Sequence, residues 1–196
     1  MPITYTNRKG HTYYLCQGMT KTGKSRYYFA REPKDGSPEQ IPEGYRISES
    51  INGVVSLVKD QPQLILPPEV ASVEAALARH PKGSDYRVAV QKNQIVIYER
   101  LGPDVDSLSE IFGKFSPLSS GVMKRRLQEQ LDKTARFSPV MRFILLDPQE
   151  RKFIPERWCY LGNVDNWINI GEAEKLEKLA RRLVPSLGTD DFFGLF

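Results

Sequence analysis

The sequence predicts an α+β protein, with antiparallel β-hairpins in its N-terminal third and mixed helices and hairpins, including a C-terminal helix, in the remainder. Two observations indicate this class. Runs rich in tyrosine, phenylalanine and valine are separated by short glycine-containing turns, and apolar residues recur at helical spacing only beyond residue 62. The helices and strands do not alternate as a parallel sheet requires. With 40% hydrophobic and 27% charged residues in 196, a packed core is expected rather than disorder.

The first hairpin is expected from residues 11–16 and 25–31. Both segments are rich in tyrosine, and the second adds a phenylalanine, which suits a half-buried pleated surface. Residues 17–24 between them contain two glycines and have the composition of a loop.

A second hairpin is predicted from residues 45–49 and 54–58. Asn52 and Gly53 lie between the two strands, and both residue types tolerate positive φ, which favours a tight turn. Residues 1 to about 60 are therefore expected to form a four-stranded antiparallel meander.

Three longer helices are predicted from apolar residues at helical spacing. They cover 69–80, which Pro81 ends, about 119–134, and about 172–184, which Pro185 ends. The apolar face of the last helix comprises Leu176, Leu179, Ala180 and Leu183. A capping box formed by Ser107 and Glu110 indicates a further short helix containing Leu108, Ile111 and Phe112.

Two more hairpins are expected in the second part of the chain. One pairs residues 86–91 with 94–98, and the other pairs 140–146 with 152–160. Pro155 has no N–H to donate, so it limits the returning strand to a sheet edge or an interruption. The inward-facing set of the first pair comprises Val88, Val90, Ile95 and Ile97.

A proline-rich segment, Asp-Gln-Pro-Gln-Leu-Ile-Leu-Pro-Pro, begins at Asp60 and has the composition of a linker. We expect residues 1–62 to form a small antiparallel β module and residues 63–196 an α+β domain. A single continuous domain is the alternative.

Charge is distributed unevenly along the chain. The net charge is only +4, yet the first 31 residues contain six basic residues and no acidic one. The last twelve residues contain no basic residue, two acids and three phenylalanines. The two ends of the chain are therefore chemically opposite.

The residue types that most often carry catalysis are scarce. His11 begins a predicted strand and His80 ends a predicted helix, where the helix dipole alone favours it. Cys16 and Cys159 lie in apolar strand contexts typical of small buried hydrophobic residues. We therefore expect no catalytic residue, no metal site and no cofactor.

Two further patterns suggest chemistry but lack its context. Gly18 to Ser25 matches a phosphate-binding loop by spacing, but a strand follows it where that loop needs a helix. Asp85 with Glu99, and the Glu150-x-Lys152 triplet near Asp147, only partly match the carboxylate patterns of metal-dependent nucleases. A cryptic metal-dependent nuclease or hydrolase stays open as an alternative.

The N-terminal segment interleaves basic and aromatic residues, as nucleic-acid-binding sheets do. The Lys-Gly-x-x-Tyr-Tyr-Leu and Arg-Tyr-Tyr-Phe runs that begin at Lys9 and Arg26 resemble, in architecture, the small three-stranded DNA-binding sheets of phage-type integrase arm-binding domains. No residue roles follow from that resemblance. The predicted nucleic-acid-binding residues are Arg8, Lys9, Lys21, Lys24, Arg26, Tyr14 and Tyr27.

The C-terminal tail concentrates apolar residues that are costly to leave in water. Phe192, Phe193, Leu195 and Phe196 are candidate partner-binding residues, and Asp190 and Asp191 before them favour a groove with basic rims. The other possibility is that the tail packs on the chain's own fold, which the short connection after the last helix favours.

Together these features predict a non-enzymatic binding protein, an accessory subunit of a nucleic-acid-processing complex that contacts DNA or RNA through its basic N-terminal sheet. A protein–protein adaptor with no nucleic-acid role is the first alternative. The absence of a signal peptide, of a membrane-spanning run and of a disulfide framework favours a cytoplasmic protein without membrane contact.

Overall fold

A computed structural model describes residues 2–34, 36–102, 121–161 and 164–194. The fold is α+β with antiparallel hairpins, as the sequence predicts. Contacts divide the chain into two compact units: Met1–Asp60 with Leu101–Arg136, and Gln61–Arg100 with Phe137–Phe196. The division into residues 1–62 and 63–196 stays a prediction.

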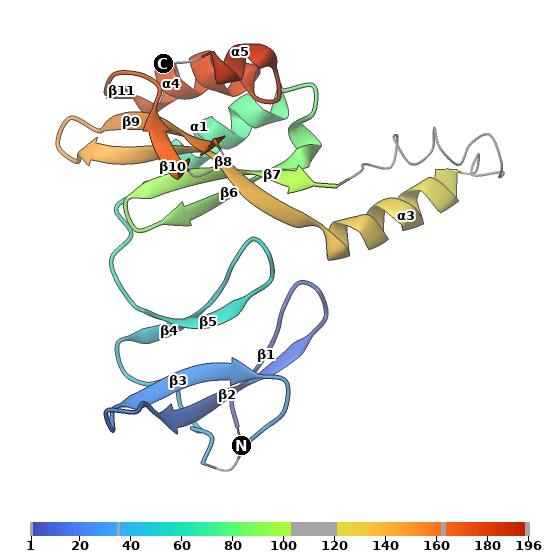
Figure 1. Cartoon of the computed structure of the whole chain (residues 1–196), viewed down its shortest axis with the longest axis vertical. Helices are drawn as coiled ribbons and strands as arrows, with labels where there is room; N and C mark the ends of the chain where they lie inside the picture. The colour runs from blue at the N-terminus through green and yellow to red at the C-terminus, as the bar shows by residue number, and fades with distance from the viewer. Residues whose placement is uncertain (1, 35, 103–120, 162–163, 195–196) are drawn as a thin grey trace. The chain divides into compact units, whose positions relative to one another are not determined.

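The first unit contains two antiparallel sheets (Figure 1). Strands β1 (Thr4–Thr6), β2 (Thr12–Met19) and β3 (Ser25–Ala30) form one, and β4 (Tyr45–Glu49) and β5 (Val55–Lys59) form the other. The predicted single four-stranded meander is therefore wrong. The segment between β3 and β4 contains three prolines, which donate no hydrogen bonds to a ladder, and it separates the two sheets.

The turn between β4 and β5 differs from the two-residue turn that Asn-Gly favours. Gly53 has a φ of +77°, whereas Asn52 is not in the left-handed region. Ser50 donates its N–H to the carbonyl of Val54, and Gly53 donates its N–H to the carbonyl of Ser50, both at 2.9 Å. The loop is thus wider than a two-residue turn, and one glycine supplies its positive φ.

The second unit is built on a six-stranded sheet with the order β10-β9-β8-β7-β6, and β11 also pairs with β9 (Figure 1). Its strands are β6 (Tyr86–Gln91), β7 (Gln94–Leu101), β8 (Arg136–Asp147), β9 (Lys152–Leu161), β10 (Val164–Asn169) and β11 (Glu174–Lys175). In the β6–β7 hairpin, Val88 pairs with Ile97 and Val90 with Ile95, as predicted.

Helices α1 (Pro67–Ala78), α4 (Leu176–Leu183) and α5 (Asp190–Phe193) lie over one face of that sheet (Figure 1). The predicted apolar face of the last long helix is buried in full, because Leu176, Leu179, Ala180 and Leu183 all join the core. That helix begins later than predicted, since residues just before it form β11. Helix α3 (Gly121–Thr134) precedes β8, and the short helix expected around Ser107 lies outside the described residues.

Pro155 lies in an interior strand, so of the two predicted positions the sheet edge is excluded and the interruption applies. On its outer side β9 pairs with β10 from residue 156 onwards and with β11 at residues 152 and 153, and the ladder is interrupted at Pro155. An interior strand accepts Pro155 because of the direction of its main chain. The carbonyl of Pro155 accepts from the N–H of Ile170 at 3.1 Å. The nitrogen of Pro155 therefore points to the side of β9 that faces away from β8. On that side Pro155 lies between the residues of β9 that pair with β10 and those that pair with β11, so its missing N–H removes no ladder hydrogen bond.

Candidate nucleic-acid interface

The tip of the β2–β3 hairpin is an ordered loop. Thr20 and Lys24 close it, with the N–H of Thr20 bonded to the carbonyl of Lys24 at 2.8 Å and the N–H of Lys24 bonded to the hydroxyl of Thr20 at 3.0 Å. Gly23 takes the left-handed conformation, at a φ of +76°, and donates to the carbonyl of Thr20. The loop therefore has a defined shape before it meets any ligand.

Three basic residues gather at this tip and are exposed: Lys21, Lys24 and Arg26. Within the described ranges none of the three side chains has an ion pair or a hydrogen bond, and the first 31 residues contain no acid to neutralise them. Met19 beside them is 79% exposed. We call Lys21, Lys24 and Arg26 the tip cluster.

Arg8 and Lys9 lie at the other end of β2 and do not belong to the tip cluster. Eight residues of β2 separate the two ends, which corresponds to roughly 23 Å at the usual rise of a strand. Arg8 is also neutralised, because Glu49 accepts its main-chain N–H at 3.0 Å and lies 3.8 Å from its guanidinium nitrogen Nε. The predicted basic residues are thus two separate groups.

Glu49, which neutralises Arg8, also accepts a hydrogen bond from Tyr5. The hydroxyl of Tyr5 donates to Glu49 at 3.0 Å, and this hydrogen bond raises the pKa of Tyr5. Glu49 therefore links β1 to β4, and Arg8 is part of a structural contact between the two sheets of the first unit.

Tyr14 and Tyr27 point to opposite faces of the three-stranded sheet. Tyr14 pairs with Ala30, and Tyr27 pairs with Gln17, three positions along β2 from Tyr14. Residues an odd number of positions apart on a strand point to opposite faces. The two predicted tyrosines therefore do not form one stacking surface.

Two cation–π contacts on this sheet involve tyrosines that were not selected from the sequence. The guanidinium of Arg31 lies 5.1 Å from the ring centre of Tyr13, and the ammonium of Lys34 lies 5.4 Å from that of Tyr28. The only sequence signal for them is that aromatic and basic residues alternate along this segment, which does not specify the pairs.

The ring of His80 makes two hydrogen bonds to the main chain and both cysteines are buried, whereas His11 is exposed. His80 accepts the main-chain N–H of Lys82 at Nδ1, at 3.1 Å, so Nε2 carries the proton and donates to the carbonyl of Leu187, also at 3.1 Å. Cys16 and Cys159 are free and buried. His80 thereby joins the end of α1 to the segment before α5.

Two of the carboxylates singled out in the sequence, Glu99 and Asp147, accept local hydrogen bonds. Glu99 accepts from the hydroxyl of Tyr86 at 3.1 Å, and burial, together with the charge of Glu99, raises the pKa of Tyr86. Asp147 accepts the N–H groups of Gln149 and Glu150 in a turn. Among the described residues, no three His, Cys, Asp or Glu side chains are placed to hold a metal ion.

The candidate partner-binding residues of the tail separate into buried and exposed positions. Phe192 is 4% exposed and belongs to the core of the second unit, whereas Phe193 is 62% exposed. Leu195 and Phe196 lie outside the described residues. The role of these four tail residues in binding a partner stays a prediction.

No family model, curated protein or solved structure matches this chain. Among the described residues, no helix is both long enough and apolar enough to cross a lipid bilayer.

Proposed function

We propose that this chain is a non-enzymatic accessory protein of a nucleic-acid-processing complex and that it contacts nucleic acid through the tip of its β2–β3 hairpin. The observation that carries the proposal is the tip cluster. Lys21, Lys24 and Arg26 are exposed, have no partner within the described ranges and are presented by an ordered two-stranded ribbon.

The shape of the hairpin suits a duplex. The major groove of B-DNA admits a two-stranded β-ribbon, and lysine and arginine side chains on such a ribbon reach phosphates at the groove edges. Each phosphate contact releases counterions, so three contacts give a log–log salt slope of roughly −2.7 on duplex DNA.

The chemistry of the tip favours binding without base selectivity. From Met19 to Arg26 the sequence has no aromatic residue on which a base could stack, and its polar side chains are short hydroxyls and basic groups. Such a surface positions the protein on the phosphate backbone and reads little sequence.

Fluorescence anisotropy with duplex DNA, single-stranded DNA and RNA at stepped salt concentrations tests the proposal. The triple variant Lys21→Glu, Lys24→Glu, Arg26→Glu should lose binding to duplex DNA. The matched control is the triple variant Lys59→Glu, Lys92→Glu, Lys133→Glu, which changes the net charge by the same amount at exposed lysines elsewhere. This control should retain most of the binding to duplex DNA. Equal losses in both variants, or no binding by the unmodified chain at low salt, would contradict the proposal.

The alternative of a protein–protein adaptor is supported by exposed aromatic side chains on the second unit. Tyr160 is 74% exposed and Phe193 62% exposed, and aromatic residues often anchor protein interfaces. Copurification from the native host with and without nuclease treatment separates the two functions. Partners that persist after nuclease treatment and do not need the tip cluster favour the adaptor.

The proposal includes a cytoplasmic location. Cys16 and Cys159 are both free thiols, which is the state that a reducing compartment maintains.

A further inference from the structure

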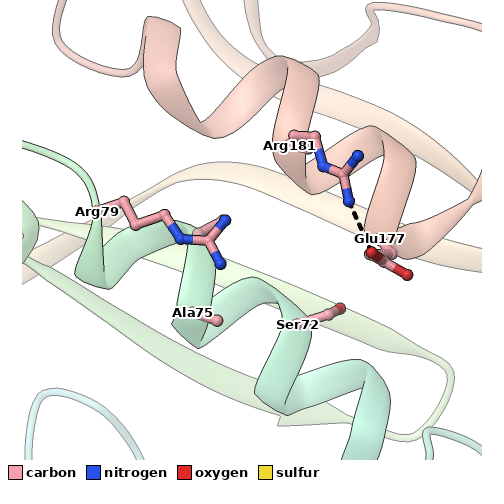
Figure 2. A pocket seen from close by; sticks show the side chains of 6 residues that line it. Ser72, Ala75, Arg79, Glu177 and Arg181 are labelled. Carbon is pink, nitrogen blue, oxygen red and sulfur yellow. Dashed lines mark hydrogen bonds and ion pairs between the residues drawn. The ribbon is translucent and has the colours of Figure 1, made fainter.

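Helices α1 and α4 are separated at the surface by a small groove of about 170 Å³ (Figure 2). That volume is about ten times what a single water molecule needs. Its lining residues are Ser72, Ala75, Ala76, Arg79, Glu177 and Arg181. The groove is independent of the hairpin tip, since every lining residue belongs to the second unit.

The groove follows from the way the two helices divide their faces. Val73 and Leu77 of α1 and Leu179 and Leu183 of α4 are buried together in the core. On the outer side α1 presents alanines, whose side chains are too short to fill the space between the helices. The floor is therefore small and apolar, and the longer polar residues stand at its rim.

The rim carries two guanidinium groups, one from Arg79, the residue that follows α1, and one from Arg181 of α4. The guanidinium of Arg79 extends into the space between the helices, and Arg181 lies on the facing helix (Figure 2). Within the described ranges the side chain of Arg79 has no ion pair or hydrogen bond. Arg181 pairs with Glu177 at 2.8 Å. The groove therefore has one positive charge that is not neutralised.

The pair on α4 is easily exchanged for a ligand. Arg181 and Glu177 are an i,i+4 pair whose side chains are 73% and 74% exposed, and exposed pairs of this kind contribute little stability. Ser72 uses its hydroxyl proton to bond the carbonyl of Glu69 at 2.8 Å, so anion recognition at this rim falls to the two arginines.

We propose that this groove binds a single phosphate group, held between Arg79 and Arg181. Guanidinium groups bind the oxygens of phosphate in pairs, with stronger hydrogen bonds than neutral donors make. The phosphate takes the place of Glu177 as the partner of Arg181 and supplies Arg79 with one. The volume suits the phosphate itself and leaves the rest of a phosphorylated molecule outside the groove.

An NMR titration of the isotope-labelled full chain with inorganic phosphate tests this inference. A titration with sodium chloride at matched ionic strength is the control. Saturable shifts are expected for amides of α1 and α4 near Arg79 and Arg181. Adenosine monophosphate in a parallel titration should shift the same amides if a phosphate monoester also binds, whereas acetate should bind more weakly. Absence of saturable shifts at these amides would overturn the proposal.

Three variants make the test specific. Arg79→Ala should weaken phosphate binding by about tenfold or more, as expected for loss of a charged hydrogen-bond donor. Glu177→Gln should tighten it by roughly two- to five-fold, because the competing carboxylate is removed. Arg126→Ala, an exposed arginine on α3, is the control and should change nothing.

Arg79→Lys keeps the positive charge but not the paired hydrogen-bond donors of a guanidinium group. It replaces Arg79→Ala as the test variant if Arg79→Ala lowers the melting temperature of the protein. Weaker binding in Arg79→Lys supports the site. Equal binding by the unmodified chain, Arg79→Lys and Arg79→Ala would show that phosphate does not use this groove.

Discussion

Arg157 donates a hydrogen bond from Nη2 to the main-chain carbonyl of Phe193, at 3.1 Å, and so joins the middle of β9 to the end of α5. Arg157 is only 5% exposed, and its guanidinium lies 6.0 Å from the ring centre of Phe193. Phe192, the preceding residue, is in the core. The described part of the tail is therefore packed on its own fold.

Phe192→Ala should destabilise the protein by about 3–5 kcal/mol, the usual cost of removing a buried phenylalanine ring. Phe193→Ala is the matched control from the same turn and should cost much less, because its side chain is mostly in water. Urea denaturation followed by circular dichroism measures both. Equal midpoints for Phe192→Ala and the unmodified chain would show that the tail does not stabilise the fold.

Gly23→Ala and Gly53→Ala should differ in cost although both glycines have positive φ, +76° and +77°. A Cβ at Gly23 meets no atom within 4 Å, so only backbone strain of about 1–2 kcal/mol is expected. A Cβ at Gly53 lies 3.2 Å from Nδ2 of Asn7, which donates to the carbonyl of Gly53. Gly53→Ala should therefore have the lower urea midpoint, and the reverse order would contradict this account of the turn.

Glu69→Ala should destabilise the second unit by about 1–3 kcal/mol, since it removes hydrogen bonds to a charged group. Glu69 accepts from Nε of Arg151 at 2.8 Å and from the N–H of Leu66 at 2.8 Å, and so joins the start of α1 to the turn before β9. The control is Glu74→Ala, an exposed position on the same helix, where a change within about 0.5 kcal/mol is expected. Chemical denaturation measures the stability of both variants. Similar losses would show that the hydrogen bonds of Glu69 to Arg151 and Leu66 contribute nothing specific.

Glu174 should make folding stability depend on pH in the acid range. Hydrogen bonds and charge from Lys178 and Arg182 hold the pKa of Glu174 below its usual 4.5. The carboxyl ionises more easily in the folded chain, so its contribution is present at neutral pH and is lost as the pH falls through the folded-state pKa.

The stability difference between the unmodified chain and Glu174→Gln should therefore be largest near about pH 7 and shrink towards about pH 3. Urea denaturation at stepped pH measures it, and Glu172→Gln, an exposed neighbour, is the control. A difference that grows as the pH falls would refute the assigned sign.

Elements whose signals are local could be predicted from the sequence. Helix α4 is an example, because Leu176, Leu179 and Leu183 follow the helical period and are all buried. The β6–β7 hairpin is another, since both of its strands and the turn between them lie within one short segment. In each case the residues that stabilise the element are close together in the chain.

Other features depended on contacts between distant segments. β1 and β11 have only three and two residues, too few for a pattern, and they form because β2 and β9 are there to pair with them. The sequence left open whether Pro155 lies at a sheet edge or at an interruption for the same reason, because strand order is decided by residues that pair from elsewhere in the chain.

The candidate interface shows the same division. The sequence by itself determined that the first 31 residues are basic and aromatic, and it identified Lys21, Lys24 and Arg26. Only the tertiary structure decided that Arg8 is held by Glu49 at the far end of β2 and that Tyr14 and Tyr27 face opposite ways. Composition is a property of the chain alone. Strand register decides on which face of a sheet a side chain lies, and segments distant in the sequence decide which residues it contacts and whether its charge is neutralised.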